Sequence, residues 1–151
     1  MRYALLGLML LGCGSTVKDA AKDTLNYSKT YLNTINTTYA RLYTEQAKEA
    51  LAKADADVYN YHRIMEPWDI GVTGLYIATN AVHTAEKALA AWEATGDASW
   101  FYNSAACLFE ALYQVRDLLR ALGVDTPDPY FNKALAIGKQ FFAEGTCQSG
   151  L

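Results

Sequence analysis

The sequence predicts an all-α protein, an up-and-down helical bundle of about four helices with a long N-terminal helix. Helix breakers are rare, because the 151 residues include only three prolines and ten glycines. Apolar residues recur at the helical spacing of three to four residues in each long segment, and no segment alternates as a half-buried strand does. The length suits one domain with its own core. We therefore expect a single helical domain.

The N-terminus has the pattern of an export signal. Arg2 precedes an apolar run from Ala4 to Leu11, and Gly12 and Cys13 follow it. The run is much shorter than the roughly 20 residues of a membrane-spanning helix, and its length and basic start are typical of a secretory signal.

The segment Leu10-Leu11-Gly12-Cys13 resembles the lipobox of bacterial lipoproteins. The resemblance covers residues 1–16 and implies that the chain is cut before Cys13, that the Cys13 thiol is lipidated and that the new N-terminus is acylated. Several acyl chains on one residue hold a protein stably on a membrane. The expected segments are a signal peptide at 1–12, a lipidated anchor and linker at 13–16, a helical bundle domain at 17–146 and a C-terminal tail at 147–151.

Gly14 stands directly after the cysteine. By the same resemblance, this residue implies sorting to the outer membrane of a two-membrane cell, on its periplasmic face or its surface, rather than retention at the inner membrane. Two alternatives are an ordinary cleaved signal whose apolar run ends in cysteine, and a cytoplasmic protein with a buried first helix.

The first helix is expected between Ser15 and Pro67, where the chain contains neither proline nor glycine. This segment predicts one long helix or two in series. Its apolar positions run from Leu25 to Met65 at a mean spacing of about 3.6 residues, the period of a nearly straight helix that packs on neighbours. Pro67 is expected to mark the following turn, because proline disrupts a helix interior.

The second helix is expected to begin between Trp68 and Thr73, with Asp69 or Thr73 as its N-cap. It should end at Thr95, because Gly96 is the residue type that most easily adopts the left-handed conformation at a helix end.

The third helix should follow a cap at Asp97 or Ser99 and end at Gly123. Its apolar face is the clearest in the chain: Phe101, Ala105, Leu108, Leu112, Val115, Leu119 and Leu122. The segment Thr126-Pro127-Asp128-Pro129 predicts a turn that opens a fourth helix from Pro129 to Glu144. One face of that helix would carry Phe131, Leu135, Gly138 and Phe142.

The expected helix lengths do not match. An unbroken first helix would be roughly 75 Å long, whereas the second and third would be roughly 36 to 40 Å. We expect residues 16–38 to project from the membrane as a stalk; the alternative is a break within 33–38, where Asn and Thr are weak helix formers. In a stalk, Leu25, Leu32 and Ile35 would need a partner, for which a second copy of the chain is a candidate.

Two cysteines, Cys107 and Cys147, remain beside the lipidated one. Export to an oxidising compartment makes a disulfide between them possible, and two unpaired or buried thiols are the alternative.

A candidate partner surface follows from the expected turns. If the turns at Pro67 and Pro127 lie at one end of the bundle, aromatic and polar side chains gather there, a mixture common in protein interfaces. These residues are Tyr59, Tyr61, His62, Trp68, Tyr130 and Phe131. The alternative is that they close the end of the core.

Catalytic and cofactor motifs are absent from the sequence, which contains no phosphate-binding glycine loop, no Gly-x-Ser-x-Gly and no Cys-x-x-Cys. The spacings His83-x-x-Glu86 and His62-x-x-x-Glu66 are more typical of solvated helix faces than of a metal site. A net charge of −3 argues against nucleic acid as a partner.

The sequence therefore favours a non-enzymatic, membrane-anchored lipoprotein of the cell envelope, without metal or cofactor. It would act through contact with another envelope protein, through self-association of its N-terminal helix, or in a structural role. The alternative is a periplasmic bundle that binds an apolar small molecule between its helices, lined by Tyr and Phe.

Overall fold

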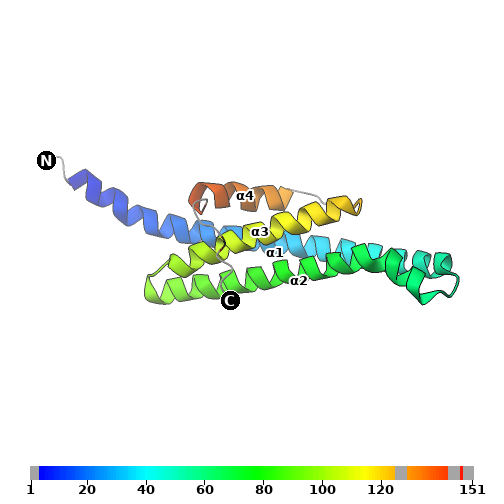
Figure 1. Cartoon of the computed structure of the whole chain (residues 1–151). Coiled ribbons are helices and arrows are strands. Elements are labelled where there is room, and N and C mark those ends of the chain that lie inside the picture. The colour runs from blue at the N-terminus through cyan, green and yellow to red at the C-terminus, as the bar shows by residue number, and fades with distance from the viewer. Residues whose placement is uncertain (1–3, 125–128, 143–146, 148–151) are drawn as a thin grey trace.

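Four helices form an up-and-down bundle (Figure 1), as the sequence predicts. The computed structural model describes the backbone of residues 4–124, 129–142 and 147, with side chains from Val17 onwards. In these ranges it contains no strand, and its helices are α1 (Ala4–Ala54), α2 (Val58–Thr95), α3 (Ser99–Ala121) and α4 (Pro129–Phe141). The main packing contacts join α1 to α2, α2 to α3 and α4 to α1.

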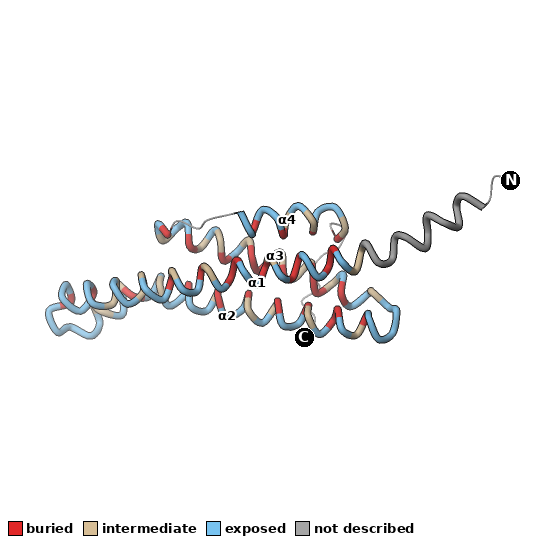
Figure 2. Tube along the Cα trace, turned by 180° about the vertical axis from the view of Figure 1, so that it is seen from behind, coloured by how far each residue is buried: buried red, intermediate tan, exposed pale blue. Residues whose placement is uncertain are grey.

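The core lies where the four helices overlap, and the middle of α1, from Ala20 to Tyr39, runs through it. Figure 2 shows buried residues along this part of α1 and along the facing sides of its neighbours. Leu25, Leu32 and Ile35 are only 4%, 4% and 2% exposed. The ring of Phe131 on α4 lies against Tyr31 of α1, with 5.2 Å between the ring centroids.

The expected stalk is therefore wrong for the residues that the structure describes, 17–38, and so is the alternative break within 33–38. α1 is continuous to Ala54. Although α4 has only 13 residues, it folds back antiparallel to α1 and covers the part of α1 that carries Tyr27 and Tyr31. As a result, Leu25, Leu32 and Ile35 find their apolar partners within their own chain and do not require a second copy.

The expected ends and faces of the later helices are largely confirmed. Gly96 ends α2 with a φ of 80°, and Gly123 follows α3 with a φ of 73°. Asp97 Oδ1 accepts the amide hydrogen of Ser99 at 2.9 Å where α3 begins. The predicted face of α3 is buried from Phe101 to Leu119, and that of α4 is buried at Phe131, Gly138 and Phe142. The predicted turn at 126–128 and the last residues of the predicted fourth helix, 143–144, lie outside the described residues.

The turn between the first two helices lies at residues 55–57 and not at Pro67, so the predicted start of the second helix between Trp68 and Thr73 is wrong. Asp55 and Ala56 adopt positive φ values of 46° and 64°. Asp57 then caps α2, because its Oδ1 accepts the Tyr59 amide hydrogen at 2.9 Å and its Oδ2 accepts a hydrogen from Asn60 Nδ2 at 2.8 Å. A side-chain cap of this kind satisfies amide groups that have no partner within the helix.

Pro67 lies inside α2, although proline in a helix interior costs about 3 kcal/mol. Burial on both sides of it outweighs this cost. Met65 is 1% exposed and Leu75 is 4% exposed, and full burial of one such side chain contributes about 1.5 to 3 kcal/mol. A single long α2 therefore continues through the proline because both of its halves pack on α1.

The contact between Tyr39 of α1 and Gly71 of α2 brings the two helices close together. A Cβ atom on Gly71 would lie 2.1 Å from the Tyr39 hydroxyl oxygen and 2.6 Å from Cζ. The Tyr39 hydroxyl donates to the backbone carbonyl of Trp68, and the Tyr39 and Trp68 rings lie 5.6 Å apart between centroids. Glycine is needed at position 71 because the tyrosine ring occupies the space of a side chain.

A disulfide joins α3 to the chain beyond α4. The sulfur atoms of Cys107 and Cys147 are bonded, and their Cα atoms lie 4.5 Å apart. The bond encloses α4 in a loop with a sequence separation of 40 residues, which in the chain-entropy model contributes about 4 kcal/mol of stability. It thereby helps to hold this short helix against α1.

We predict that Gly71→Ala lowers the free energy of unfolding by about 1 to 3 kcal/mol, because the added methyl group displaces Tyr39. Urea denaturation of the purified protein measures this change. Gly74→Ala is the matched control: its Cβ would lie 3.2 Å from Leu118 Cδ2, the movable end of a flexible side chain, and alanine favours the helix by up to about 1 kcal/mol. Equal effects of the two substitutions would contradict the assigned role of Gly71.

Candidate interaction surface

A two-helix arm extends from the bundle beyond the ends of α3 and α4 (Figure 1). We define the arm as residues 44–67, which include the last part of α1, the turn and the start of α2. Small side chains, Ala50 and Ala54, and the longer Met65 are buried between its two helices. The two helices of the arm therefore lie close together, with few bulky side chains between them.

The arm tip exposes three large apolar side chains. Leu51 is 62% exposed, Val58 is 68% exposed and Tyr59 is 76% exposed. Leu51 and Val58 line one shallow hollow at the turn, together with Ala56. Single exposed apolar residues are common on protein surfaces, whereas a group at a protruding end indicates a site for contact with another molecule.

The predicted partner surface is only partly present. Tyr59 and His62 belong to the arm, and Trp68 lies at its base against Tyr39. Phe131 is 1% exposed and lies in the core, while Tyr130 stacks on Tyr27 with 6.5 Å between centroids. These residues do not gather at one end of the bundle. The chain turns at Asp55, twelve residues before Pro67, which was expected to mark the turn.

Phe131 instead serves packing. Besides Tyr31, it contacts the ring of Tyr113, with 5.3 Å between centroids. The guanidinium carbon of Arg116 lies 4.8 Å from its ring centroid. An arginine over an aromatic face adds a cation–π attraction to the burial of the ring. This residue therefore anchors α4 to α1 and α3 and is not available to a partner.

Tyr43 and Tyr39 link α1 to α2 at the base of the arm. The Tyr43 hydroxyl donates to Asp69 Oδ1 at 2.7 Å, and the two tyrosine rings lie 6.2 Å apart between centroids. The hydrogen bond to Asp69 raises the pKa of Tyr43 to about 12. Burial raises the pKa of Tyr39 to about 12 as well. Both hydroxyls donate to α2, and the raised pKa values keep them protonated to a higher pH than an ordinary tyrosine.

A groove follows the open face between α1 and α2, next to these tyrosines. It has a volume of about 530 Å³. The lining residues are Asn36, Tyr39, Ala40, Tyr43 and Thr44 from α1, and Val72, Leu75, Tyr76 and Thr79 from α2. Val72 and Tyr76 are 49% and 67% exposed. This groove was not predicted from the sequence, because it depends on how α1 and α2 pack against each other.

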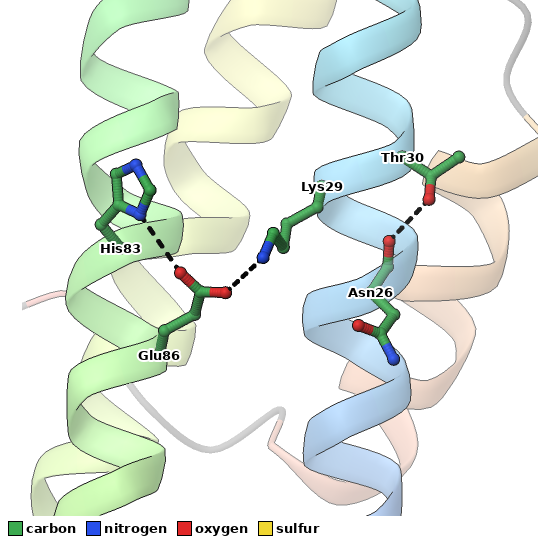
Figure 3. A network of polar contacts seen from close by, with 5 residues as sticks. All are labelled: Asn26, Lys29, Thr30, His83 and Glu86. Carbon is green, nitrogen blue, oxygen red and sulfur yellow. Dashed lines mark hydrogen bonds and ion pairs between the residues drawn. The ribbon is translucent and has the colours of Figure 1, made fainter.

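A network of polar contacts joins α1 and α2 on the face that carries the groove, nearer the N-terminus of α1 (Figure 3). Lys29 Nζ lies 2.6 Å from Glu86 Oε1, and His83 Nδ1 lies 3.1 Å from Glu86 Oε2. The Lys29 hydrogen bond lowers the pKa of Glu86. Thr30, on the far side of α1 in this view, donates to the carbonyl oxygen of Asn26. Exposed ion pairs contribute little stability, so this network adds little to the packing of α1 on α2.

Neither histidine spacing noted in the sequence forms a metal centre in the part of the chain that the structure describes. The Glu86 carboxylate is engaged with both His83 and Lys29, and no group of three His, Cys, Asp or Glu side chains in the described ranges is arranged to hold a metal ion. Among the described helices, none has a stretch that is long and apolar enough to span a membrane. The Cys13 side chain lies outside the described residues, so its lipidation stays a prediction.

Comparisons of this chain with protein-family models, with curated proteins and with solved structures find no match.

We predict that stability falls as the pH rises from about 10 through about 12. The pKa of Tyr43 and of Tyr39 is higher in the folded protein than the ordinary value of 10.0, so the folded state holds these protons more tightly than the unfolded state. The stabilisation is complete below pH 10 and is lost as the tyrosines ionise.

Tyrosinate absorbance, followed together with circular dichroism, measures this transition. Tyr43→Phe should remove one late-titrating tyrosine and weaken the alkaline loss of stability. An unchanged titration curve in this variant would contradict the assignment.

Proposed function

We propose that this protein is a non-enzymatic lipoprotein of the bacterial cell envelope, anchored through Cys13, that contacts another envelope protein with the tip of its arm. The observation that carries the proposal is the group of exposed apolar side chains at the tip, formed by Leu51, Val58 and Tyr59. The outer membrane is the proposed location, on the periplasmic face or the surface.

The continuity of α1 supports this role. From Val17 to Ala54 the helix spans about 55 Å at 1.5 Å per residue. The tip therefore lies at the opposite end of the molecule from the segment that would carry the lipid. A chain built in this way would present its contact site well clear of its own membrane.

The composition of the tip also supports a protein partner. Leu51 and Val58 line one hollow together with Asp57, and Tyr59 lines a neighbouring one with charged residues; Lys53 and Asp55 are close to them in the sequence. An apolar centre with a polar rim is the common arrangement of specific interfaces, in which large side chains such as tyrosine supply much of the binding energy. The Asp57 cap orders the backbone that carries Val58 and Tyr59, and an ordered backbone loses less entropy on binding.

We predict that Cys13→Ser releases the protein from the membrane fraction and abolishes the incorporation of labelled palmitate, because the proposed lipid needs the thiol. Cell fractionation and metabolic labelling measure the two effects. Cys107→Ser is the matched control and should keep the lipid label. Retention of the Cys13→Ser chain on membranes would contradict the anchor.

We predict that the triple variant Leu51→Ser, Val58→Ser and Tyr59→Ser reduces partner capture in cells at least tenfold. Chemical crosslinking of the full chain measures this capture. The control carries Val72→Ser, Ile77→Ser and Trp100→Ser, three residues that are 49%, 50% and 47% exposed and lie away from the tip. Exposed substitutions of this kind change stability little. If both triple variants lose the crosslinked species equally, or neither does, the tip is not the contact site.

A further inference from the structure

We infer that the groove between α1 and α2 binds an uncharged aromatic molecule that carries an N–H or O–H hydrogen-bond donor. The groove lies beside the base of the arm and is separate from the arm tip. Its volume of about 530 Å³ is within the range of sites for small molecules. No residue from α3 or α4 is among the described residues that line it.

The charges around the groove point to a neutral ligand. Although 19% of the chain is charged, no charged side chain is among the described lining residues. Asp69 contacts Tyr43 but does not line the groove. An ionic ligand would lose hydration there without gaining an opposite charge, and this loss opposes its binding.

The lining residues favour an aromatic ligand. Tyr43 and Tyr76 line the groove from its two sides, and Val72 and Leu75 add apolar surface on α2. Tyr76 is 67% exposed, so its ring is available to contact a bound molecule. Contacts between aromatic rings contribute about 0.5 to 1.5 kcal/mol beyond the area they bury.

The hydrogen bonds of the lining hydroxyls favour a ligand that donates. Thr44 Oγ1 donates to the Ala40 carbonyl and Thr79 Oγ1 donates to the Leu75 carbonyl, both at 2.8 Å. The hydroxyls of Tyr43 and Tyr39 donate to Asp69 and to the Trp68 carbonyl. Four of the five lining hydroxyls thus use their hydrogens within the protein, while their oxygens retain lone pairs that accept a hydrogen from a ligand. The exposed Tyr76 hydroxyl and the exposed Asn36 amide are lining groups that can also donate.

The groove is too short for a helix to dock along it. Its lining on α1 runs from Asn36 to Thr44, which is about 12 Å of helix. Towards the N-terminus of α1, the Lys29–Glu86 ion pair links α1 and α2 across the same face. At the other end, the Tyr43–Asp69 hydrogen bond joins α1 to α2. A compact ring system matches this length better than an extended peptide.

The contacts beneath the groove hold its floor in place before a ligand binds. Tyr39 is 3% exposed, and its ring is seated on Gly71. Tyr43 is held by its hydrogen bond to Asp69. A site that is already ordered loses less entropy on binding, so a small ligand binds with higher affinity.

The test compares two fluorescent probes that share one aromatic skeleton. It uses the chain as the cell processes it, without the first twelve residues, or the full chain in detergent. N-phenyl-1-naphthylamine is neutral and has two aromatic groups and one N–H donor, and 8-anilinonaphthalene-1-sulfonate adds an anionic sulfonate. We expect the neutral probe to bind at least tenfold more tightly. Ala40→Glu, which places a charge in the groove at an exposed helix position, should weaken binding of the neutral probe at least tenfold.

Two control variants separate the groove from the general surface. Ala52→Glu adds the same charge to α1 outside the groove and should leave probe affinity unchanged. Tyr76→Ala should weaken binding, whereas Ile77→Ala, one residue further along α2 and 50% exposed, should not.

Equal affinity for the two probes, or equal effects of Ala40→Glu and Ala52→Glu, would overturn the inference. Probe binding that disappears as protein concentration rises, with a dimer in light scattering, would show that a second copy covers the groove, and this also overturns it. Ala40→Glu, Tyr76→Ala and Ile77→Ala all lie outside the arm, so crosslinking of these variants through Leu51, Val58 and Tyr59 reports independently on the proposed function.

Discussion

The close approach of α1 and α2 at Tyr39 and Gly71 is the constraint on which the rest of the structure depends. The tyrosine ring occupies the space that a Cβ atom would take on Gly71. The two helices therefore pack tightly on both sides of Pro67, and this packing outweighs the cost of a proline inside α2. Because α2 does not end at the proline, the turn moves out to residues 55–57, and the arm exists.

The opposite half of the molecule is stabilised differently. There α4 lies along α1, with Phe131 between Tyr31 and Tyr113, and the Cys107–Cys147 bond encloses this helix. In this half of the molecule four helices pack together, whereas the arm contains only two. Such a division suits a protein that is held at one end and makes contact at the other.

The two surfaces described here differ in chemistry. The arm tip protrudes and exposes apolar side chains with charged neighbours, and it suits a protein partner. The groove is concave and free of charge among its described lining residues, and it suits a small molecule. Both depend on the α1–α2 pair, since Tyr39 and Tyr43 form the floor of the groove and the base of the arm.

The sequence by itself determined the all-α class, the faces of α3 and α4, and the helix ends at Gly96 and Gly123, because helical spacing and left-handed glycine conformations are local properties. Asp57 offered a local signal for the true turn, as an aspartate at an N-cap position, but Pro67 was the stronger breaker by propensity. Only the tertiary structure decided that α2 continues through Pro67, that α4 covers α1, and that Val72 and Tyr76 face a groove. These features depend on contacts between residues far apart in the chain, such as Tyr39 with Gly71, and their burial energies outweigh local preference.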